Sequence, residues 1–262
     1  MTDFLTTIMA RRLHFAHESA THNALQTLRK HAEKRHHHSL IRKLRSTPGP
    51  HIIAEIKKAS PSSGEIVHDF DPVRIARAYA ANGAAAISVL TEPEYFMGSL
   101  DDLAAVRAVV DLPLLRKDFI SHPGHMLEAA ANGADVVLLI VAGLTKKVLN
   151  DLYTIARDLD LETLVEVHTE PELEQALALP DAIIGVNSRN LKTLKTDLNI
   201  ARLLIASIPT DRLAIAESGI RTADEVSELA SRGYRGFLIG TSLLTHNNPG
   251  TALHALLHLG EQ

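Results

Sequence analysis

From residue 50 onward, short runs of apolar and often β-branched residues alternate with segments whose apolar residues recur at helical spacing. The runs are nearly continuously apolar, which is typical of strands buried on both faces. They recur roughly every 25–30 residues, about the length of one strand and one helix. The pattern predicts eight strands, at residues 51–56, 84–90, 114–117, 135–140, 163–167, 182–186, 213–216 and 236–239.

The segments between these runs carry the signals of helix ends. Asp71 precedes a proline, a combination that favours a helix start. Thr222 and Glu225 have the spacing of a capping box. Asn-Gly pairs at 82–83 and 132–133 supply residues that tolerate the positive φ of a helix end. Strands and helices therefore alternate along this part of the chain.

Eight strand–helix units predict an α/β fold, a closed (β/α)8 TIM barrel that occupies residues 49–262. The rival is a doubly wound open sheet, but no G-x-G-x-x-G follows the first strand. Residues 1–48 do not join the pattern and predict an N-terminal helical extension of one or two amphipathic helices, within a single domain overall. Its expected apolar contacts are Ile8, Leu13, Leu25, Leu28, Leu40, Ile41 and Leu44.

The composition narrows the classes of function. The chain has 262 residues, 45% of them hydrophobic, and a formal net charge of −4, which is an ordinary globular balance and not that of a broad nucleic-acid-binding face. The absence of cysteine excludes disulfides, thiolate metal sites and a cysteine nucleophile. The longest apolar run, 136–144, is too short to span a bilayer, and the first residues do not resemble a secretory signal. We therefore expect a soluble, cytoplasmic enzyme with no nucleic-acid or membrane partner.

Charged residues stand at the ends of the predicted strands, where a barrel places its active site. Glu55 and Lys57 are two positions apart and so lie on the same side of their strand. Glu166 lies between two valines. At 114–119 the period of two leaves two alternatives open, because either Arg116 and Asp118 or Lys117 and Phe119 face inward. A structural ion pair is the alternative to a catalytic role for Glu55 and Lys57.

Further polar residues follow the later strands. Asn187 and Arg189 come after the sixth strand, and Glu217, Ser218 and Gly219 after the seventh. Small residues in ESGI, in LIGTS and at 60–64 have the placement of a phosphate site at the helix starts after strands seven and eight. The expected site therefore suits acid–base chemistry on an anionic substrate, with no metal or other cofactor.

These motifs resemble the indole-3-glycerol-phosphate synthase family of tryptophan biosynthesis. The match extends over about residues 50–245, in order and spacing, through the motifs IIAEIKKASPSSG, LLRKDF, LVEVH, VNSRNLKT, ESGI and LIGTSLL. The resemblance implies a metal-free lyase that closes the ring of 1-(2-carboxyphenylamino)-1-deoxyribulose 5-phosphate. Loss of carbon dioxide and water then gives indole-3-glycerol phosphate.

The resemblance also implies roles for individual residues. Lys117 is the general acid that protonates the carbonyl oxygen. Lys57 lies near the substrate carboxylate, with proton donation during dehydration as a second role. Glu55 and Glu166 form an acidic pair that stabilises positive charge and removes a proton. Asn187, Arg189 and Ser218 match residues that orient the substrate. The phosphate site matches Ser60, Gly219, Gly240 and Thr241, and the walls of the aryl slot match Phe96, Phe119, Leu138 and Leu191.

Two departures from the family pattern stand out, Gly124-His125 at a helix start and Met97 in the loop after the second strand. Among the histidines, His36–His38 are expected on the surface of a helix, as are His14, His17 and His22, while His168 lies beside Glu166.

Two other functions are weighed against the leading one. One is a different barrel enzyme acting on a sugar phosphate, such as an isomerase, and the other is a catalytically silent barrel used for binding. The paired Glu55 and Lys57 together with Lys117 argue against the isomerase. Against the silent barrel, every charged position that matches the family carries its catalytic residue type. We expect a small phosphorylated substrate and a monomer or weak homodimer.

Overall fold

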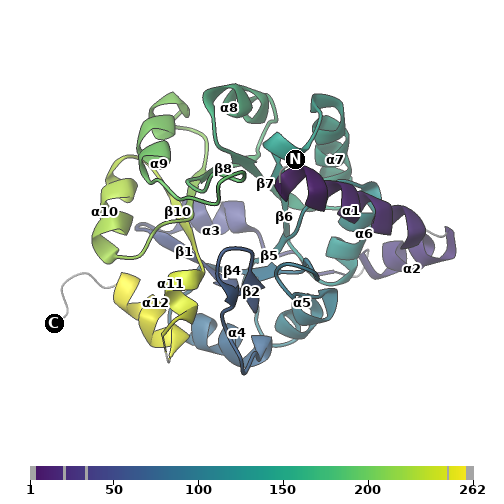
Figure 1. The fold of residues 1–262 in the computed structure, drawn as a ribbon, viewed down its shortest axis with the longest axis horizontal. Helices are drawn as coiled ribbons and strands as arrows, with labels where there is room; N and C mark the ends of the chain where they lie inside the picture. The colour runs from purple at the N-terminus through teal and green to yellow at the C-terminus, as the bar shows by residue number, and fades with distance from the viewer. Residues whose placement is uncertain (1–3, 20–21, 33–34, 247, 258–262) are drawn as a thin grey trace.

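The computed structural model describes residues 4–19, 22–32, 35–246 and 248–257. Eight parallel strands close into a barrel, and helices surround it (Figure 1). Around the barrel the order is β1, β10, β9, β8, β7, β6, β5 and β4, with β4 pairing back to β1. The strands are β1 (His51–Ile56), β4 (Ala86–Leu90), β5 (Leu114–Lys117), β6 (Val136–Ile140), β7 (Glu162–Val167), β8 (Ile183–Asn187), β9 (Ala214–Glu217) and β10 (Gly236–Ile239). The predicted TIM barrel is confirmed, and every predicted strand is present.

Helices link successive strands, and their ends follow the expected signals. Asp71 accepts a hydrogen bond from the backbone of Arg74, and Thr222 and Glu225 form a capping box. Gly83, with φ of 91°, follows the C-cap of α4 in the left-handed region that favours glycine. The barrel helices are α4 (Pro72–Ala81), α5 (Leu100–Arg107), α6 (Pro123–Ala131), α7 (Lys146–Asp158), α8 (Glu170–Leu177), α9 (Asn199–Leu204), α10 (Ala223–Ser231), α11 (Thr241–Leu244) and α12 (Pro249–Leu257). The connections also contain the 3-10 turns η1 (Val141–Gly143) and η2 (Ile205–Ser207), and a hairpin of β2 (Ala59–Ser60) and β3 (Gly64–Glu65).

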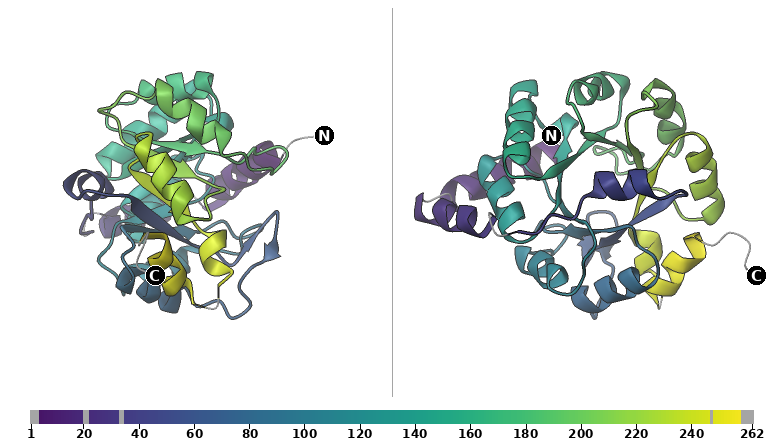
Figure 2. Two further views of the ribbon diagram at one scale, coloured as in Figure 1. Left: turned by 90° about the vertical axis from the view of Figure 1, so that its left-hand side faces the viewer. Right: turned by 180° about the vertical axis from the view of Figure 1, so that it is seen from behind.

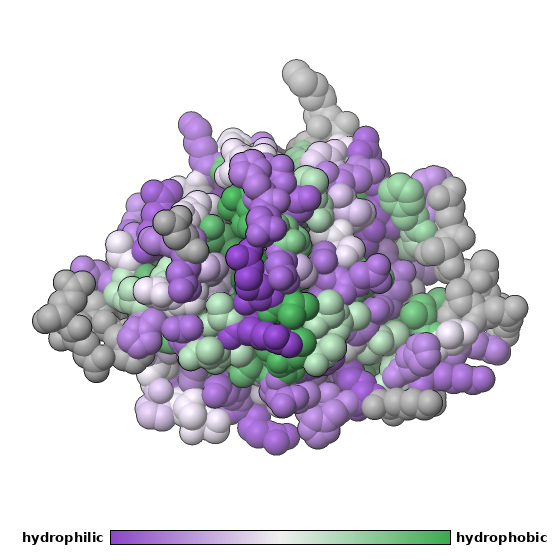
Figure 3. All heavy atoms as spheres, turned by 90° about the horizontal axis from the view of Figure 1, so that it is seen from below, coloured by the Kyte–Doolittle hydropathy of each residue, from purple (hydrophilic) through white to green (hydrophobic). Residues whose placement is uncertain are grey.

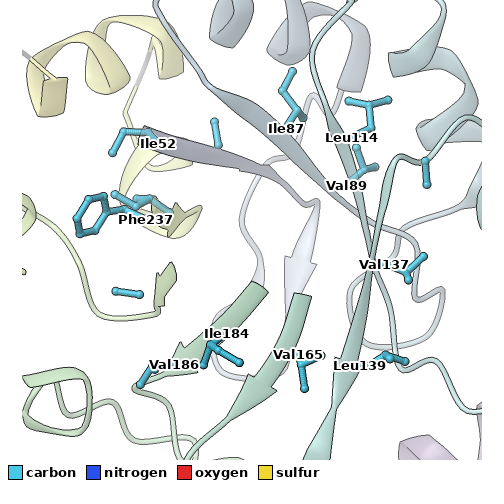
Figure 4. Close-up of a cluster of buried hydrophobic side chains, with 14 of the residues drawn as sticks. Ile52, Ile87, Val89, Leu114, Val137, Leu139, Val165, Ile184, Val186 and Phe237 are labelled. Atoms are coloured by element: carbon cyan, nitrogen blue, oxygen red, sulfur yellow. The ribbon is translucent and has the colours of Figure 1, made fainter. Parts of the chain in front are cut away.

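Successive residues of each strand point to opposite faces of the sheet, and each face packs into its own apolar layer. One layer lies between the strands and the helices and includes Ile52, Val137 and Phe237 (Figure 4). The other fills the barrel interior and includes Ile53, Leu164 and Ile215. Both sides of the strands are thus buried, which explains the continuous apolar runs in the sequence. On the face seen in Figure 3 the exterior is mostly hydrophilic, with a smaller hydrophobic area near the middle.

Among the described residues, three helices precede the barrel, and not the expected one or two. They are α1 (Phe4–Ser19), α2 (His22–Ala32) and α3 (Leu40–Ser46). In Figure 2, α1 and α3 lie at opposite ends of the barrel. Leu40 and Leu44 of α3, and Leu5 and Ile8 of α1, are buried in the same layer as the barrel interior. Leu13 is 37% exposed, so its predicted apolar contact is wrong. The division into an extension at 1–48 and a barrel at 49–262 stays a prediction.

The histidine run is not the surface of a helix, contrary to expectation. Residues 35–39 have no regular secondary structure and cross the N-terminal end of the barrel. His37 Nε2 lies 3.4 Å from Glu162 Oε1, and the backbone N–H of His38 donates to Asp135 at 2.8 Å. These carboxylates hold the segment in place. The spacing of the histidines could not show this, because Asp135 and Glu162 are distant in sequence. His14 is exposed, as expected. The side chains of His17 and His22 lie outside those described.

No helix in the described part of the chain is long and apolar enough to cross a bilayer.

Candidate active site

The carboxyl ends of the barrel strands surround a cavity of about 800 Å³. Every residue that the sequence singled out as catalytic or substrate-binding lines this cavity. They come from all parts of residues 55–241, and the closure of the sheet brings them to one end. The barrel topology is therefore what converts scattered motifs into one site.

Glu55 and Lys57 form an ion pair where β1 ends. Lys57 Nζ donates to Glu55 Oε1 at 2.6 Å, and the two side chains are 11% and 7% exposed. Burial raises the pKa of Glu55, but the attraction of Lys57 and Lys117 outweighs burial, so the pKa lies below its ordinary value. Glu55 therefore carries its charge at neutral pH.

Lys117 and Phe119 line the cavity and Arg116 does not, although Asp118 also contributes to the lining. The Arg116 side chain lies between β5 and α6. There its guanidinium donates to Thr91, to the carbonyl of His125, and to Asp118 and Glu128. Arg116 is fully buried, and these partners balance its charge.

The ammonium group of Lys117 lies between two buried carboxylates. Its Nζ is 3.6 Å from Glu166 Oε2 and 3.6 Å from Glu217 Oε2. Burial alone lowers the pKa of Lys117, but the attraction of Glu217, Glu166 and Glu55 outweighs it, so the pKa lies above its ordinary value. Lys117 is therefore a cation with protons to donate, and it faces the open cavity.

Glu217 is the charged residue to which the sequence assigned no role. It ends β9 and is only 1% exposed. Burial raises the pKa of Glu217 to about 8; the attraction of Lys117 opposes this shift, while repulsion from Glu166 and Glu55 adds to it. The signal was present, because Glu217 is a carboxylate at the end of an apolar strand, like Glu55 and Glu166. Its position in ESGI drew attention to the phosphate site instead.

Two glycines make room for the buried carboxylates. A Cβ atom on Gly185 would lie 2.2 Å from Glu217 Oε1, and one on Gly240 would lie 2.3 Å from Glu55 Oε1. Any side chain at these positions would displace the carboxylate that it meets. Gly185 and Gly240 thus help to set the positions of the charged groups.

Arg189 and Asn187 are held together where β8 ends. The Asn187 side-chain oxygen accepts the backbone N–H of Arg189 at 2.9 Å. The guanidinium of Arg189 donates to the carbonyl of Leu194 at 2.9 Å and lies 3.4 Å from Ser62 Oγ. Arg189 therefore bridges the loops that follow β8 and β1, on either side of the cavity.

The expected phosphate site is assembled from three loops. Ser60 follows β1, Gly219 follows β9, and Gly240 and Thr241 follow β10. Ser218 and Gly219 have φ of 64° and 85°, the left-handed region, which turns the chain sharply at this point. Arg221 and Ser242, which the sequence did not single out, line the same cavity.

The predicted aryl slot is lined by Phe96, Phe119, Leu138 and Leu191. Phe4, from α1, is a further lining residue that the sequence did not predict. Its ring packs edge-on against Phe119 at 6.1 Å between centroids. The N-terminal extension therefore contributes directly to the cavity, through a long-range contact that no local pattern indicates.

Ion pairs fasten α1 at the mouth of the cavity. Arg12 donates two hydrogen bonds to Asp118, at 3.0 and 2.6 Å, and Arg11 pairs with Glu94. Burial raises the pKa of Asp118, but Arg116 and Arg12 outweigh it and hold the pKa at about 2. The position of Phe4 thus depends on a charge pair about two turns further along the same helix.

The two departures from the expected pattern have local explanations. α6 begins after His122, whose side chain accepts the backbone N–H of Gly124, and His125 is buried beneath this first turn. Met97 adopts φ of 53° and is 44% exposed, so its side chain points to solvent. Within the described residues, no group of three or more His, Asp or Glu side chains is placed to hold a metal ion.

Comparisons with known proteins agree on one family. The family described as indole-3-glycerol phosphate synthase matches residues 5–256. A protein of that name from Mycolicibacterium gilvum is 47% identical over 213 residues, 81% of this chain and 78% of the relative. Another from Acidithiobacillus ferrooxidans is 43% identical over 260 residues, covering 98% of this chain and 99% of the relative.

Among solved structures, a thiamine phosphate pyrophosphorylase from Pyrococcus furiosus superposes with a TM-score of 0.61. It is 16% identical, and the match covers 83% of this chain and 96% of that one. At this identity the likeness shows the barrel fold alone.

Proposed function

The chain belongs to the indole-3-glycerol phosphate synthase family, and from this premise we propose how its cavity performs the family's reaction. The enzyme is a carbon–carbon lyase of tryptophan biosynthesis. It converts 1-(2-carboxyphenylamino)-1-deoxyribulose 5-phosphate into indole-3-glycerol phosphate, carbon dioxide and water. The observation that carries the residue assignments is Lys117, a cation between two buried carboxylates beside an apolar slot.

Four parts of the substrate are held. Its phosphate binds to the hydroxyl and N–H groups of Ser60, Gly219, Gly240 and Thr241, and its aryl ring lies between the walls formed by Phe96, Phe119, Leu138 and Leu191. Lys57 attracts the carboxylate on that ring, while Asn187, Arg189 and Ser218 orient the hydroxyl groups. The arrangement is supported by the placement of all these residues around one cavity.

In the first step the ring carbon that bears the carboxylate attacks the substrate carbonyl. A carbon–carbon bond forms, the carbonyl π bond breaks, and Lys117 gives a proton to the oxygen. The place of Lys117 on the cavity wall and the acidic neighbours that keep it protonated support this role. The nearby carboxylates of Glu55 and Glu166 stabilise the positive charge that develops on the ring and its nitrogen.

In the later steps the bond to the carboxylate breaks, and its electron pair returns to the ring as carbon dioxide leaves. The new hydroxyl group then departs as water with a proton from Lys57, and a proton leaves the adjacent CH₂ group to complete the indole. Glu166 is better placed than Glu55 to take that proton. Glu55 is already bonded to Lys57, whereas Glu166 Oε1 has no hydrogen-bond partner among the described residues.

We further propose that the protein acts in the cytoplasm as a monomer or weak homodimer, in keeping with the family's biosynthetic role. Light scattering of the purified chain across a range of concentrations tests the oligomeric state.

The assignment of the reaction is tested by mixing the purified chain with the substrate and following the growth of indole fluorescence. We expect one carbon dioxide per indole product and no change with EDTA, because no step needs a metal. Binding without turnover would favour the catalytically silent barrel. Isomerisation of a simple sugar phosphate without any indole product would favour the alternative of a sugar-phosphate isomerase.

A further inference from the structure

His168 stands between two carboxylates directly after β7. Its Nε2 lies 3.5 Å from Glu166 Oε1, and its Nδ1 lies 3.2 Å from Oε2 of Glu172 in the first turns of α8. The same Glu172 oxygen accepts the backbone N–H of His168 at 2.7 Å. Glu172 therefore fixes both the backbone and the ring of His168, and the ring's other nitrogen is directed toward the cavity carboxylate.

The two atoms that face each other are both buried and unpaired. Within the described residues, neither Glu166 Oε1 nor His168 Nε2 has a hydrogen-bond partner. An unpaired buried polar atom is costly, and a proton on Nε2 would satisfy both atoms with little movement. The geometry is that of a hydrogen bond that closes when the ring is fully protonated.

The surrounding charges favour that protonated ring. Burial lowers the pKa of His168, but the hydrogen bond to Glu172 and the charges of Glu166, Glu172 and Glu217 outweigh it, so the pKa lies above its ordinary value. The pKa of Glu172 lies below its ordinary value, because the bonds from His168 outweigh the effect of burial. From the opposite side, Lys117 on β5 faces Glu166 Oε2 and Glu217.

We propose that His168, held by Glu172, is a positioning residue for the reaction, which holds the Glu166 carboxylate between the imidazolium and Lys117. The inference rests on the proposed role of Glu166. One oxygen of that carboxylate faces Lys117 and the other faces His168. Without His168, the Glu166 oxygen that faces the ring has no group to fix its direction, so the carboxylate is less well aligned to take a proton.

The test uses the whole chain and three variants. His168→Asn retains an amide that can reach Glu172 but nothing that reaches Glu166, and Glu172→Gln leaves the imidazole in place with a weaker anchor. His51→Asn is the control, because it removes a buried histidine at the start of β1, at the other end of the barrel from the cavity, where the ring hydrogen-bonds to Thr47. Thermal unfolding of each variant establishes that it is folded.

For His168→Asn we expect kcat to fall roughly tenfold with KM within about twofold of wild type, as for loss of one supporting group. The fall in kcat that follows loss of the His168 proton as pH rises should be absent in His168→Asn. Glu172→Gln should move that fall to lower pH, because the ring loses the charge of Glu172, and His51→Asn should not move it. If His168→Asn does not fold, the shift in Glu172→Gln decides the question.

Glu166→Gln separates this inference from the proposed function. If Glu166→Gln is inactive and His168→Asn keeps the wild-type kcat and pH profile, the positioning role is wrong while the role of Glu166 stands. If Glu166→Gln is itself as active as wild type, the proposed role of Glu166 fails first. The proposal also predicts the kcat of the double variant. Adding His168→Asn to Glu166→Gln should not lower kcat further, because His168 acts through Glu166.

Discussion

Lys117 and Glu217 meet in the barrel from opposite strands, with Nζ and Oε2 3.6 Å apart. β5 and β9 are separated by three strands in either direction around the sheet, so these side chains approach across the interior. Glu166 lies at the same distance from Lys117 on the side of β7. Both carboxylates are thus buried beside Lys117, and the protonation of Glu217 depends on the charge of Lys117.

The first prediction concerns Glu217 and stability. Its pKa is about 8 in the folded protein and near the ordinary value of about 4.3 when unfolded. Between these values the folded state binds more protons, so the free energy of unfolding falls as pH rises. Glu217→Gln removes this titration. Its stability relative to wild type should therefore be higher at pH 9 than at pH 5, as measured by urea unfolding; a difference that stays constant with pH would contradict the raised pKa.

A second prediction concerns Gly185, whose missing side chain leaves space for Glu217. Gly185→Ala should fold but displace the carboxylate, with a loss of about 1–3 kcal/mol in stability from overpacking. We expect kcat to fall by roughly ten- to a hundredfold, since small displacements of catalytic groups are costly. Gly49→Ala is the control: Gly49 has φ of 95° outside the cavity, so the change strains the backbone and should leave kcat unchanged. Equal kcat values for the two variants would count against the steric argument.

A third prediction concerns the attachment of α1. Arg12→Ala removes two hydrogen bonds to the buried carboxylate of Asp118 and should lower the free energy of unfolding by about 1–3 kcal/mol. The loss should not exceed this range, because Arg116 still pairs with Asp118. Phe4 should then leave the aryl slot more easily and raise KM. The ion pair stabilises the fold above the ordinary pKa of Asp118, and this contribution is lost as pH falls toward 2.

Arg11→Ala provides the matched control for Arg12→Ala. Arg11 pairs with Glu94 at the surface, where solvent screens the charges, so its loss should affect stability and KM far less. Equal effects from the two substitutions would show that the buried pair is not what holds α1.

A fourth prediction concerns His37 and the segment that leads into α3. The hydrogen bond to Glu162 raises the pKa of His37 above its ordinary value, against the effect of burial. The stabilisation is fully present below the unfolded pKa of about 6.5 and is lost as pH rises through the folded value. The gap in stability between wild type and His37→Asn should thus be larger at pH 5.5 than at pH 8.5. His36→Asn, at an exposed position, should show no such trend in the same urea titrations.

The strands were predictable from the sequence because each is buried on both sides, so its whole length is apolar. For the same reason the sequence could not show which side chains at 116–119 face the barrel interior. Both faces of β5 are buried, so the alternation along the strand does not distinguish the inner face from the outer one. Phe4 and Glu217 were not assigned to the site for different reasons. Phe4 reaches the site through a contact with Phe119, which is distant in sequence. Glu217 belongs to the ESGI motif, which was interpreted as part of the phosphate site. His37 was misplaced because its partner, Glu162, is distant in sequence.

Ring closure depends on the proton that Lys117 gives to the carbonyl oxygen. Single-turnover fluorescence with Lys117→Met, alongside equilibrium binding of the substrate and thermal unfolding, measures this dependence. We predict a folded variant that binds substrate but forms indole product roughly 10²–10⁴-fold more slowly than wild type. A folded Lys117→Met variant that retains more than about a tenth of the wild-type rate would contradict this dependence.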